Sequence, residues 1–264
     1  MNPDHHDEHD LGLQHDMSVL LGRRRLLGLL AGAGLAAVAG CAVGGGPGGP
    51  PGGGAVAAGS VGEIPQETAG PYPGDGSNGP NVLTESGIVR SDITSSFGSA
   101  TGTAAGVPLR IELTLTDTAG APLPGAALYL WHCDRDGHYS LYDIEDQNYL
   151  RGVQEADAAG KVAFTSIFPA CYAGRWPHVH FEAYPNLAAA TTSDNAITTS
   201  QLALPQDICD QVYATDGYQQ SVSKLSGVSL EGDNVFSDGV DSQLATVTGS
   251  VPDGLVATLT VPVA

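Results

Sequence analysis

Between residues 109 and 116, apolar and polar side chains alternate without a break. The apolar positions are Leu109, Ile111, Leu113 and Leu115, and the polar positions are Arg110, Glu112, Thr114 and Thr116. Successive side chains of an extended strand point to opposite faces, so this order gathers the four aliphatic residues on one face. A helix would spread the same residues around its circumference. The segment therefore predicts a strand with one buried face.

Similar short apolar stretches, each bounded by Gly, Pro or Asp, follow along the chain. They predict further strands over residues 126–132, 161–166, 179–183, 244–248 and 255–261. Only residues 205–213 and 219–225 suit helices, and both are short. These patterns predict an all-β fold: a β-sandwich of mostly antiparallel strands with long functional loops and few short helices.

The N-terminal segment has the pattern of an export signal. Arg23, Arg24 and Arg25 precede an apolar run over residues 26–38 that is too short to span a bilayer. The arginines followed by Leu-Leu resemble a twin-arginine signal, and the small residues before Cys41 resemble a bacterial lipobox. We expect residues 1–40 to be the signal, starting at Met1 or Met17. The protein would be exported to the cell envelope, lipid-anchored through Cys41 to the outer face of the cytoplasmic membrane, or secreted. An uncleaved anchor is the alternative.

The rest of the chain divides into a tether and a domain. Residues 41–63 are rich in Gly and Pro and cannot bury a core, whereas residues 64–264 have the length of one domain. The chain has 10 Lys and Arg against 29 Asp and Glu, a net charge of −19. No basic cluster of the kind that binds nucleic acid is present, so nucleic acid is excluded as a partner. The oligomeric state stays open.

Three cysteines lie in this domain: Cys133, Cys171 and Cys209. An exported protein meets oxidising conditions, which favour one disulfide and one remaining thiol. We favour a Cys133–Cys209 bond, because Cys171 lies inside the candidate metal motif described next.

Two short segments hold the candidate chemistry. His178 and His180 lie two residues apart in a predicted strand, so their imidazoles share one face and can bind one metal ion together. Tyr139 and Tyr172 lie in the same two segments, residues 131–139 and 169–181. A phenol has a pKa of about 10 and ionises at neutral pH only when a strong Lewis acid holds the phenolate, which favours Fe(3+).

Two other interpretations compete with a ferric site. His178, His180 and Glu182 could form a divalent-metal site of two histidines and one carboxylate, which leaves both tyrosines unexplained. Alternatively, the chain could be a lipid-tethered, non-catalytic β-sandwich binding module. That interpretation leaves the histidine pair without a role.

The segments together resemble a known family, the intradiol ring-cleavage dioxygenases, and more closely an exported lipoprotein-like branch of it. The resemblance runs from about residue 67 to 262. It rests on Trp131-His132-Cys133-Asp134 with Gly137 and Tyr139-Ser140, on Tyr172 with Arg175, His178 and His180, and on the shorter segments 68–72, 90–93, 152–154 and 234–239.

This resemblance implies a function and a role for each site residue. Tyr139, Tyr172, His178 and His180 would be ligands of a ferric ion, and Tyr172 would leave the metal and accept a substrate proton. Arg175 would stabilise negative charge on the substrate, and Gln201 would line the oxygen pocket. The enzyme would cleave a small aromatic diol of the catechol type with O2, between the two hydroxylated carbons, to a cis,cis-muconate-type product.

Overall fold

The computed structural model describes residues 62–264. Its strands are β1 (Pro108–Asp117), β2 (Ala127–Trp131), β3 (Arg151–Glu155), β4 (Lys161–Ile167), β5 (His178–Tyr184), β6 (Thr198–Ala203), β7 (Thr246–Ser250) and β8 (Gly254–Val263). Its helices are α2 (Gln206–Tyr213) and α3 (Gln219–Leu225), with short 3-10 turns η2 (Leu187–Ala189) and η3 (Ser193–Asn195).

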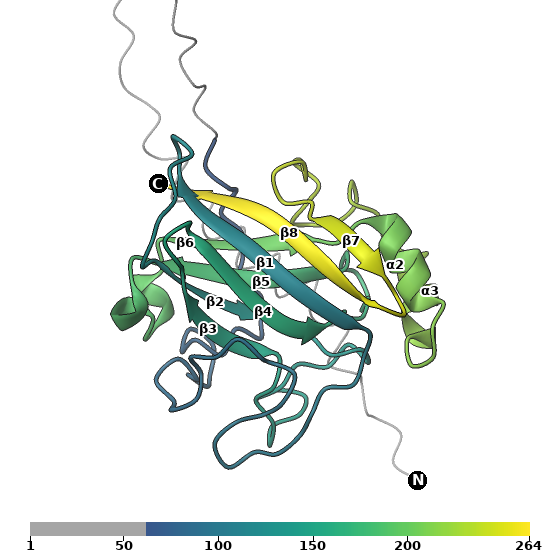
Figure 1. Ribbon diagram of the computed structural model, residues 1–264. Coiled ribbons are helices and arrows are strands. Elements are labelled where there is room, and N and C mark those ends of the chain that lie inside the picture. Colours follow the sequence, from purple (N-terminus) through teal and green to yellow (C-terminus); the bar gives the residue numbers. More distant parts are fainter. Residues whose placement is uncertain (1–61) are drawn as a thin grey trace, which may run out of the picture.

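The strands form two four-stranded sheets that face each other (Figure 1). One sheet has the order β4-β1-β8-β7 and the other the order β3-β2-β5-β6. Every pairing is antiparallel except that of β1 with β8, in which Leu109 lies opposite Leu255. The structure therefore confirms the predicted sandwich of mostly antiparallel strands.

The main core lies between the sheets, where the alternation in β1 predicts a buried face. The four aliphatic residues of β1 are at most 1% exposed. They belong to one packed cluster with Leu128 and Leu130 of β2 and with Val179 and Phe181 of β5. Every second residue of these strands thus contributes to a single apolar layer.

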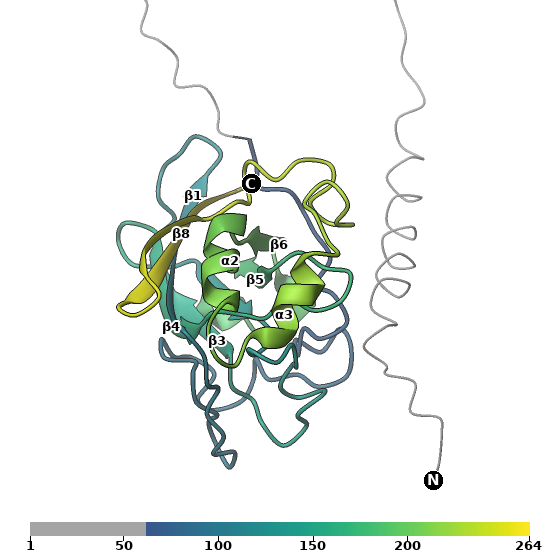
Figure 2. The ribbon, with the colours of Figure 1, turned by 90° about the vertical axis from the view of Figure 1, so that its right-hand side faces the viewer.

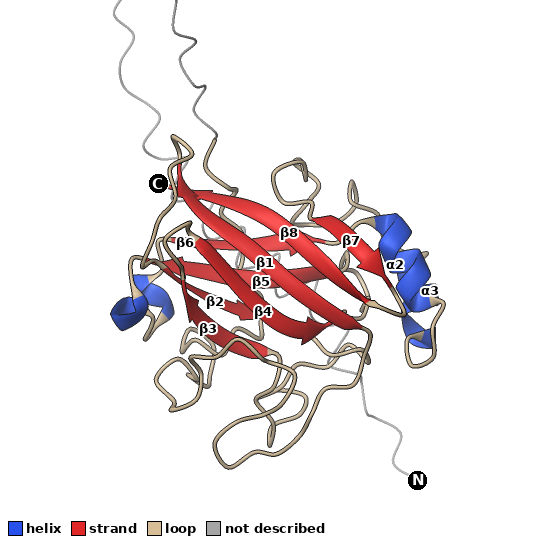
Figure 3. Ribbon diagram, in the orientation of Figure 1, coloured by secondary structure: helices blue, strands red, loops and turns tan. Residues whose placement is uncertain are grey.

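The second sheet is buried on its outer face as well. All residues of β2 and β5 are buried, because loops cover the side that faces away from the first sheet. Tyr129 and Trp131 pack there against Val82 and Leu83 of the loop that precedes β1. Long loops make up a large part of the molecule (Figure 3). A polar side chain on this outer face is therefore shielded from water.

The two α-helices lie side by side at one end of the sandwich, as Figure 2 shows. Helix α2 packs Cys209, Val212 and Tyr213 into the main core. Both helices fall where the sequence predicts them. Within residues 62–264, no helix has the length and apolar character needed to cross a membrane.

The predicted Cys133–Cys209 disulfide is wrong, because all three cysteines of the domain are free and buried. Cys133 follows Tyr129 and Trp131 in the strand alternation and packs with them on the outer face of the second sheet. Cys209 lies in the main core together with Cys171. Cys133 and Cys209 thus pack in different clusters.

The sequence predictions for the signal over residues 1–40, for the lipid on Cys41 and for most of the tether concern residues outside the described part of the chain. They stay predictions.

Candidate metal centre

Four side-chain donor atoms meet on the outer face of the second sheet. Tyr139 Oη lies 3.3 Å from Tyr172 Oη, which lies 3.1 Å from His178 Nε2. His178 Nε2 in turn lies 3.0 Å from His180 Nε2. The structure thus brings together the four residues that the sequence analysis expects to bind metal.

Strand β5 supplies the two histidines. Its alternation points His178 and His180 outward while Val179 and Phe181 enter the main core. The His180 ring lies parallel to the indole of Trp131, with centroids 5.0 Å apart and an interplanar angle of 4°. Trp131 is directly opposite His180 in the β2–β5 pairing, so strand register sets this stacking.

The protonation of His178 is set by a backbone carbonyl. Its Nδ1 lies 2.5 Å from the Trp176 carbonyl oxygen, which only accepts, so Nδ1 donates and Nε2 keeps its lone pair. Burial and the nearby Arg175 lower the pKa of His178 to about 3. Burial and His178 hold the pKa of His180 well below its ordinary value. Both imidazoles are therefore neutral at physiological pH, as metal ligands must be.

The two tyrosines differ in exposure. Tyr139 is 1% exposed, and burial together with Tyr172 raises the pKa of its phenol well above the ordinary 10.0. Tyr172 is half-buried and lies in the loop between β4 and β5. A phenolate at Tyr139 therefore requires a strong Lewis acid, and Tyr172 has more room to move.

This donor set fits a metal ion. Metal–nitrogen bonds of about 2.1 Å at right angles place neighbouring donor atoms about 3 Å apart, which matches the 3.0–3.3 Å separations found here. Two neutral imidazoles and two phenols form a hard, potentially dianionic set that suits a ferric ion.

The competing site with Glu182 is not formed. Glu182 Oε2 accepts a hydrogen bond of 2.6 Å from Tyr184 Oη, and Glu182 Oε1 lies 3.4 Å from Thr199 Oγ1. Among residues 62–264 there is no group of three or more His, Cys, Asp or Glu that could hold a metal ion. His132 is also engaged elsewhere, with the Cys133 carbonyl and Ser166.

Arg175 and Gln201 lie together beside the four donors. Gln201 is opposite His180 in the β5–β6 pairing, and its Oε1 accepts a hydrogen bond of 2.7 Å from Arg175 Nη2. Arg175 Nε also donates to Asp233 Oδ2 at 3.0 Å. Sequence reasoning missed Asp233, although it directly precedes the Asn234–Gly239 segment that contributes to the family resemblance.

A strap formed by residues 68–75 makes one wall of the site. Tyr72 stacks on the Tyr139 ring with a centroid distance of 4.8 Å. Gly70 approaches His180 so closely that a Cβ atom there would lie 3.3 Å from His180 Cε1. The strap thus contacts two of the four donor residues.

Arg151 holds the strap in place. This fully buried side chain donates to the carbonyl oxygens of Tyr72 and Pro73 at 2.9 and 2.8 Å. It also donates to Ser140, the residue after Tyr139. Sequence reasoning missed Arg151, although a charged residue directly before the Gly152–Gln154 segment was a signal.

Known proteins share both the sequence and the fold of this region. A family profile described as "Dioxygenase" matches residues 78–207. The hydroxyquinol 1,2-dioxygenase of Corynebacterium glutamicum is 36% identical over 75 residues, which cover 28% of this chain and 25% of that protein. The catechol 1,2-dioxygenase of Pseudomonas sp. (strain EST1001) is 42% identical over 57 residues, 21% of this chain and 19% of that protein.

Over residues 78–207, just under half of its length, the chain is similar to the intradiol ring-cleavage dioxygenase family. Members of this family use a non-haem ferric ion. The matched segments span about a quarter or less of these curated relatives. A solved intradiol ring-cleavage dioxygenase from Tetranychus urticae has the same fold, with a TM-score of 0.56 at 23% identity over 68% of this chain and 88% of that one.

Proposed function

We propose that this protein is a ferric intradiol dioxygenase that cleaves a catechol-type ring between its two hydroxylated carbons with O2. The observation that carries the proposal is the convergence of Tyr139, Tyr172, His178 and His180 on one point. These four side chains would hold the ferric ion, and a small aromatic diol and O2 are the substrates. Bound there, the ion would supply Lewis acidity to the substrate oxygens and accept electron density from the ring.

The protein's own groups have distinct roles in this proposal. Tyr172 is the more exposed phenol, so its Oη would accept a proton from a substrate hydroxyl, while buried Tyr139 stays in place. The Arg175 guanidinium would stabilise the negative charge that develops on substrate oxygen. Gln201 would orient Arg175 through its Oε1. The strap would exclude water from the face occupied by Tyr139 and His180.

A visible absorption spectrum of the iron-loaded protein tests this function. Two phenolate ligands on ferric ion should give a broad charge-transfer band that moves to longer wavelength when catechol is added without oxygen. The variant Tyr172→Phe should lose most of this shift and at least about 100-fold of kcat, because one ligand and one proton acceptor are removed.

The matched control is Tyr213→Phe. Tyr213 is a buried tyrosine of α2 that donates to the Pro169 carbonyl, outside the donor cluster. This variant should keep both the band and its response to catechol. A colourless protein that binds no iron would remove the dioxygenase proposal.

A further inference from the structure

Arg175 is held in one orientation by two partners on different elements. Its side chain is 4% exposed, its Nε donates to Asp233 Oδ2 at 3.0 Å, and its Nη2 donates to Gln201 Oε1 at 2.7 Å. The guanidinium is planar, so contacts at Nε and at one terminal nitrogen fix its plane and its direction. These two contacts therefore fix the direction in which the remaining edge of the guanidinium points.

Asp233 is itself held firmly by backbone N–H groups. Its Oδ2 also accepts from Trp176 N at 2.7 Å, and its Oδ1 accepts from Val235 N at 2.9 Å and Phe236 N at 3.3 Å. Burial alone would raise the pKa of this carboxyl, but Arg175 and the backbone N–H groups hold the pKa below its ordinary value. Asp233 is therefore an anion, fully buried beside a buried cation.

The other partner connects Arg175 to the wall of the site. Gln201 Nε2 donates to the Thr68 carbonyl at 2.9 Å, and Thr68 begins the strap that places Gly70 against His180. Asp233, Arg175, Gln201 and Thr68 thus form one continuous hydrogen-bonded series. A displacement of the Asp233 carboxylate would therefore also move the Arg175 guanidinium.

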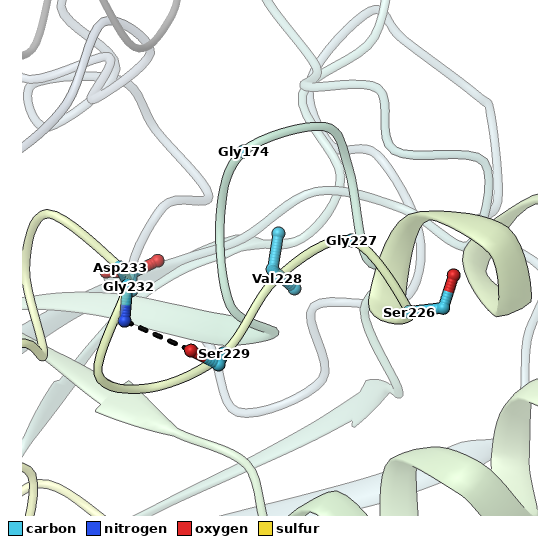
Figure 4. A pocket seen from close by; sticks show the side chains of 7 residues that line it. All are labelled: Gly174, Ser226, Gly227, Val228, Ser229, Gly232 and Asp233. Atoms are coloured by element: carbon cyan, nitrogen blue, oxygen red, sulfur yellow. Dashed lines mark hydrogen bonds between the residues drawn. The ribbon is translucent and has the colours of Figure 1, made fainter.

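A cavity of about 450 Å³ lies against Asp233 on the side of the loop that follows α3. It is lined by Gly174, Ser226, Gly227, Val228, Ser229, Gly232 and Asp233. Figure 4 shows the loop that carries Gly174 arching above Val228, with Asp233 and Gly232 at one side. The cavity is large enough for a small carboxylate such as formate.

We propose that Asp233 is a positioning residue for the catalytic arginine: its carboxylate supplies the buried counter-charge that aims Arg175 at the substrate, and the adjoining cavity gives small anions access to this place. The proposal rests on the proposed function, because Arg175 is the group through which Asp233 acts. Asp233 does not touch substrate in this account.

Chemical rescue of Asp233→Ala tests the proposal. In the iron-loaded variant, kcat with catechol should fall on the order of 10- to 100-fold, with a smaller change in KM, because charge on the transition state loses its aligned partner. Added formate should restore kcat with a saturating concentration dependence, since it can enter through the cavity and take the place of the carboxylate. Chloride at the same ionic strength should not.

Three further variants test whether formate enters through the cavity and whether the charge at residue 233 is what matters. Asp233→Asn keeps the side-chain volume without the charge, so it should be slow and should not respond to formate. Ser226→Ala alters the cavity lining without touching Asp233, and it should match the wild type. Filling the cavity in Asp233→Ala/Val228→Phe should abolish the rescue.

Thermal unfolding of the metal-free protein gives a readout that does not need dioxygenase activity. Formate should raise the Tm of Asp233→Ala more than it raises the Tm of the wild type or of Ser226→Ala. A formate-dependent Tm in a protein without ring-cleaving activity would refute the proposed function and support the role of the buried ion pair.

If Asp233→Ala does not fold, the Asp233→Asn variant tests the proposal instead. A kcat of Asp233→Asn within twofold of the wild type would overturn the proposal. So would an Asp233→Ala protein whose kcat and Tm both ignore formate.

Discussion

His180 shows how closely a single residue in this site is constrained. Its ring is stacked on Trp131 on one face, and Gly70 contacts the ring edge. Its Nε2 faces His178, and its buried Nδ1 has no hydrogen-bond partner among the described residues. A ring fixed by packing points its lone pair in one direction before a metal arrives, so little ordering remains to be done on binding.

The next residue on the same face, Glu182, has a different role. It is 1% exposed, and burial together with the neighbouring Asp75 raises its pKa from 4.5 to about 8. Asp75 Oδ2 is buried and has no donor among residues 62–264. A proton on Glu182 satisfies this atom. The Glu182 carboxyl therefore keeps its proton at neutral pH.

The proton that Glu182 retains in the fold predicts a pH-dependent stability. Below pH 4.5, Glu182 is protonated in both the folded and the unfolded chain and contributes no slope. Between pH 4.5 and 8 only the unfolded chain loses the proton, so the free energy of unfolding should fall with rising pH, by about 3 to 5 kcal/mol in total. Glu182→Gln has no such proton and should show a shallower decline and a higher stability at pH 8.

Urea unfolding of the metal-free protein at several pH values measures this difference. The control is Glu155→Gln, which changes an exposed carboxyl at the end of β3 and should keep the wild-type slope. Equal slopes for Glu182→Gln and the wild type would show that Glu182 is ionised in the fold.

Among the elements, the strap over residues 68–75 has a backbone conformation that directly affects the metal centre. Gly70 has a φ of +70°, and a side chain there would press on His180. We expect Gly70→Ala to lose about 1 to 2 kcal/mol of stability from the left-handed backbone. The displaced imidazole should also lower kcat/KM about tenfold and change the visible band of the iron-loaded protein.

A glycine that follows the strap offers a matched comparison. Gly79 has a φ of +87° and no atom within 4 Å of the place where a Cβ would lie. Gly79→Ala should therefore lose a similar amount of stability and keep the wild-type kcat/KM and spectrum. If both variants lose activity equally, the effect comes from backbone strain and the contact with His180 is unimportant.

The strands differ in how well they can be predicted from the sequence. β1 and β5 could be predicted because their apolar residues alternate towards one core. β3 and β6 were not predicted, since Arg151, Ser200 and Gln201 are buried in polar contacts that no hydrophobic pattern reveals.

The site residues differ in the same way. The ligand motifs could be found because their residues are close in the sequence, whereas Asp233 lies 58 residues after its partner Arg175. Burial of charge depends on partners that only the fold brings together.

At the scale of the whole molecule, the double covering of the second sheet decides the environment of every side chain on it. Loops shield its outer face, so the donor cluster and its neighbouring polar groups lie in a medium of low polarity. The cysteines belong to two different clusters. Cys133 lies on the outer side of this sheet, and Cys171 and Cys209 belong to the main core.

The burial of all three free thiols predicts a domain without disulfides even under oxidising conditions. Burial raises the pKa of the Cys171 thiol to about 12 and the pKa values of Cys133 and Cys209 well above their ordinary value. Since only thiolates react readily, a thiol reagent should label none of the three in the folded protein. In denaturant without reductant, peptide mapping should find all three labelled, and reductant should leave the Tm unchanged. A pair that becomes labelled only after reduction would show that two of these cysteines form a disulfide.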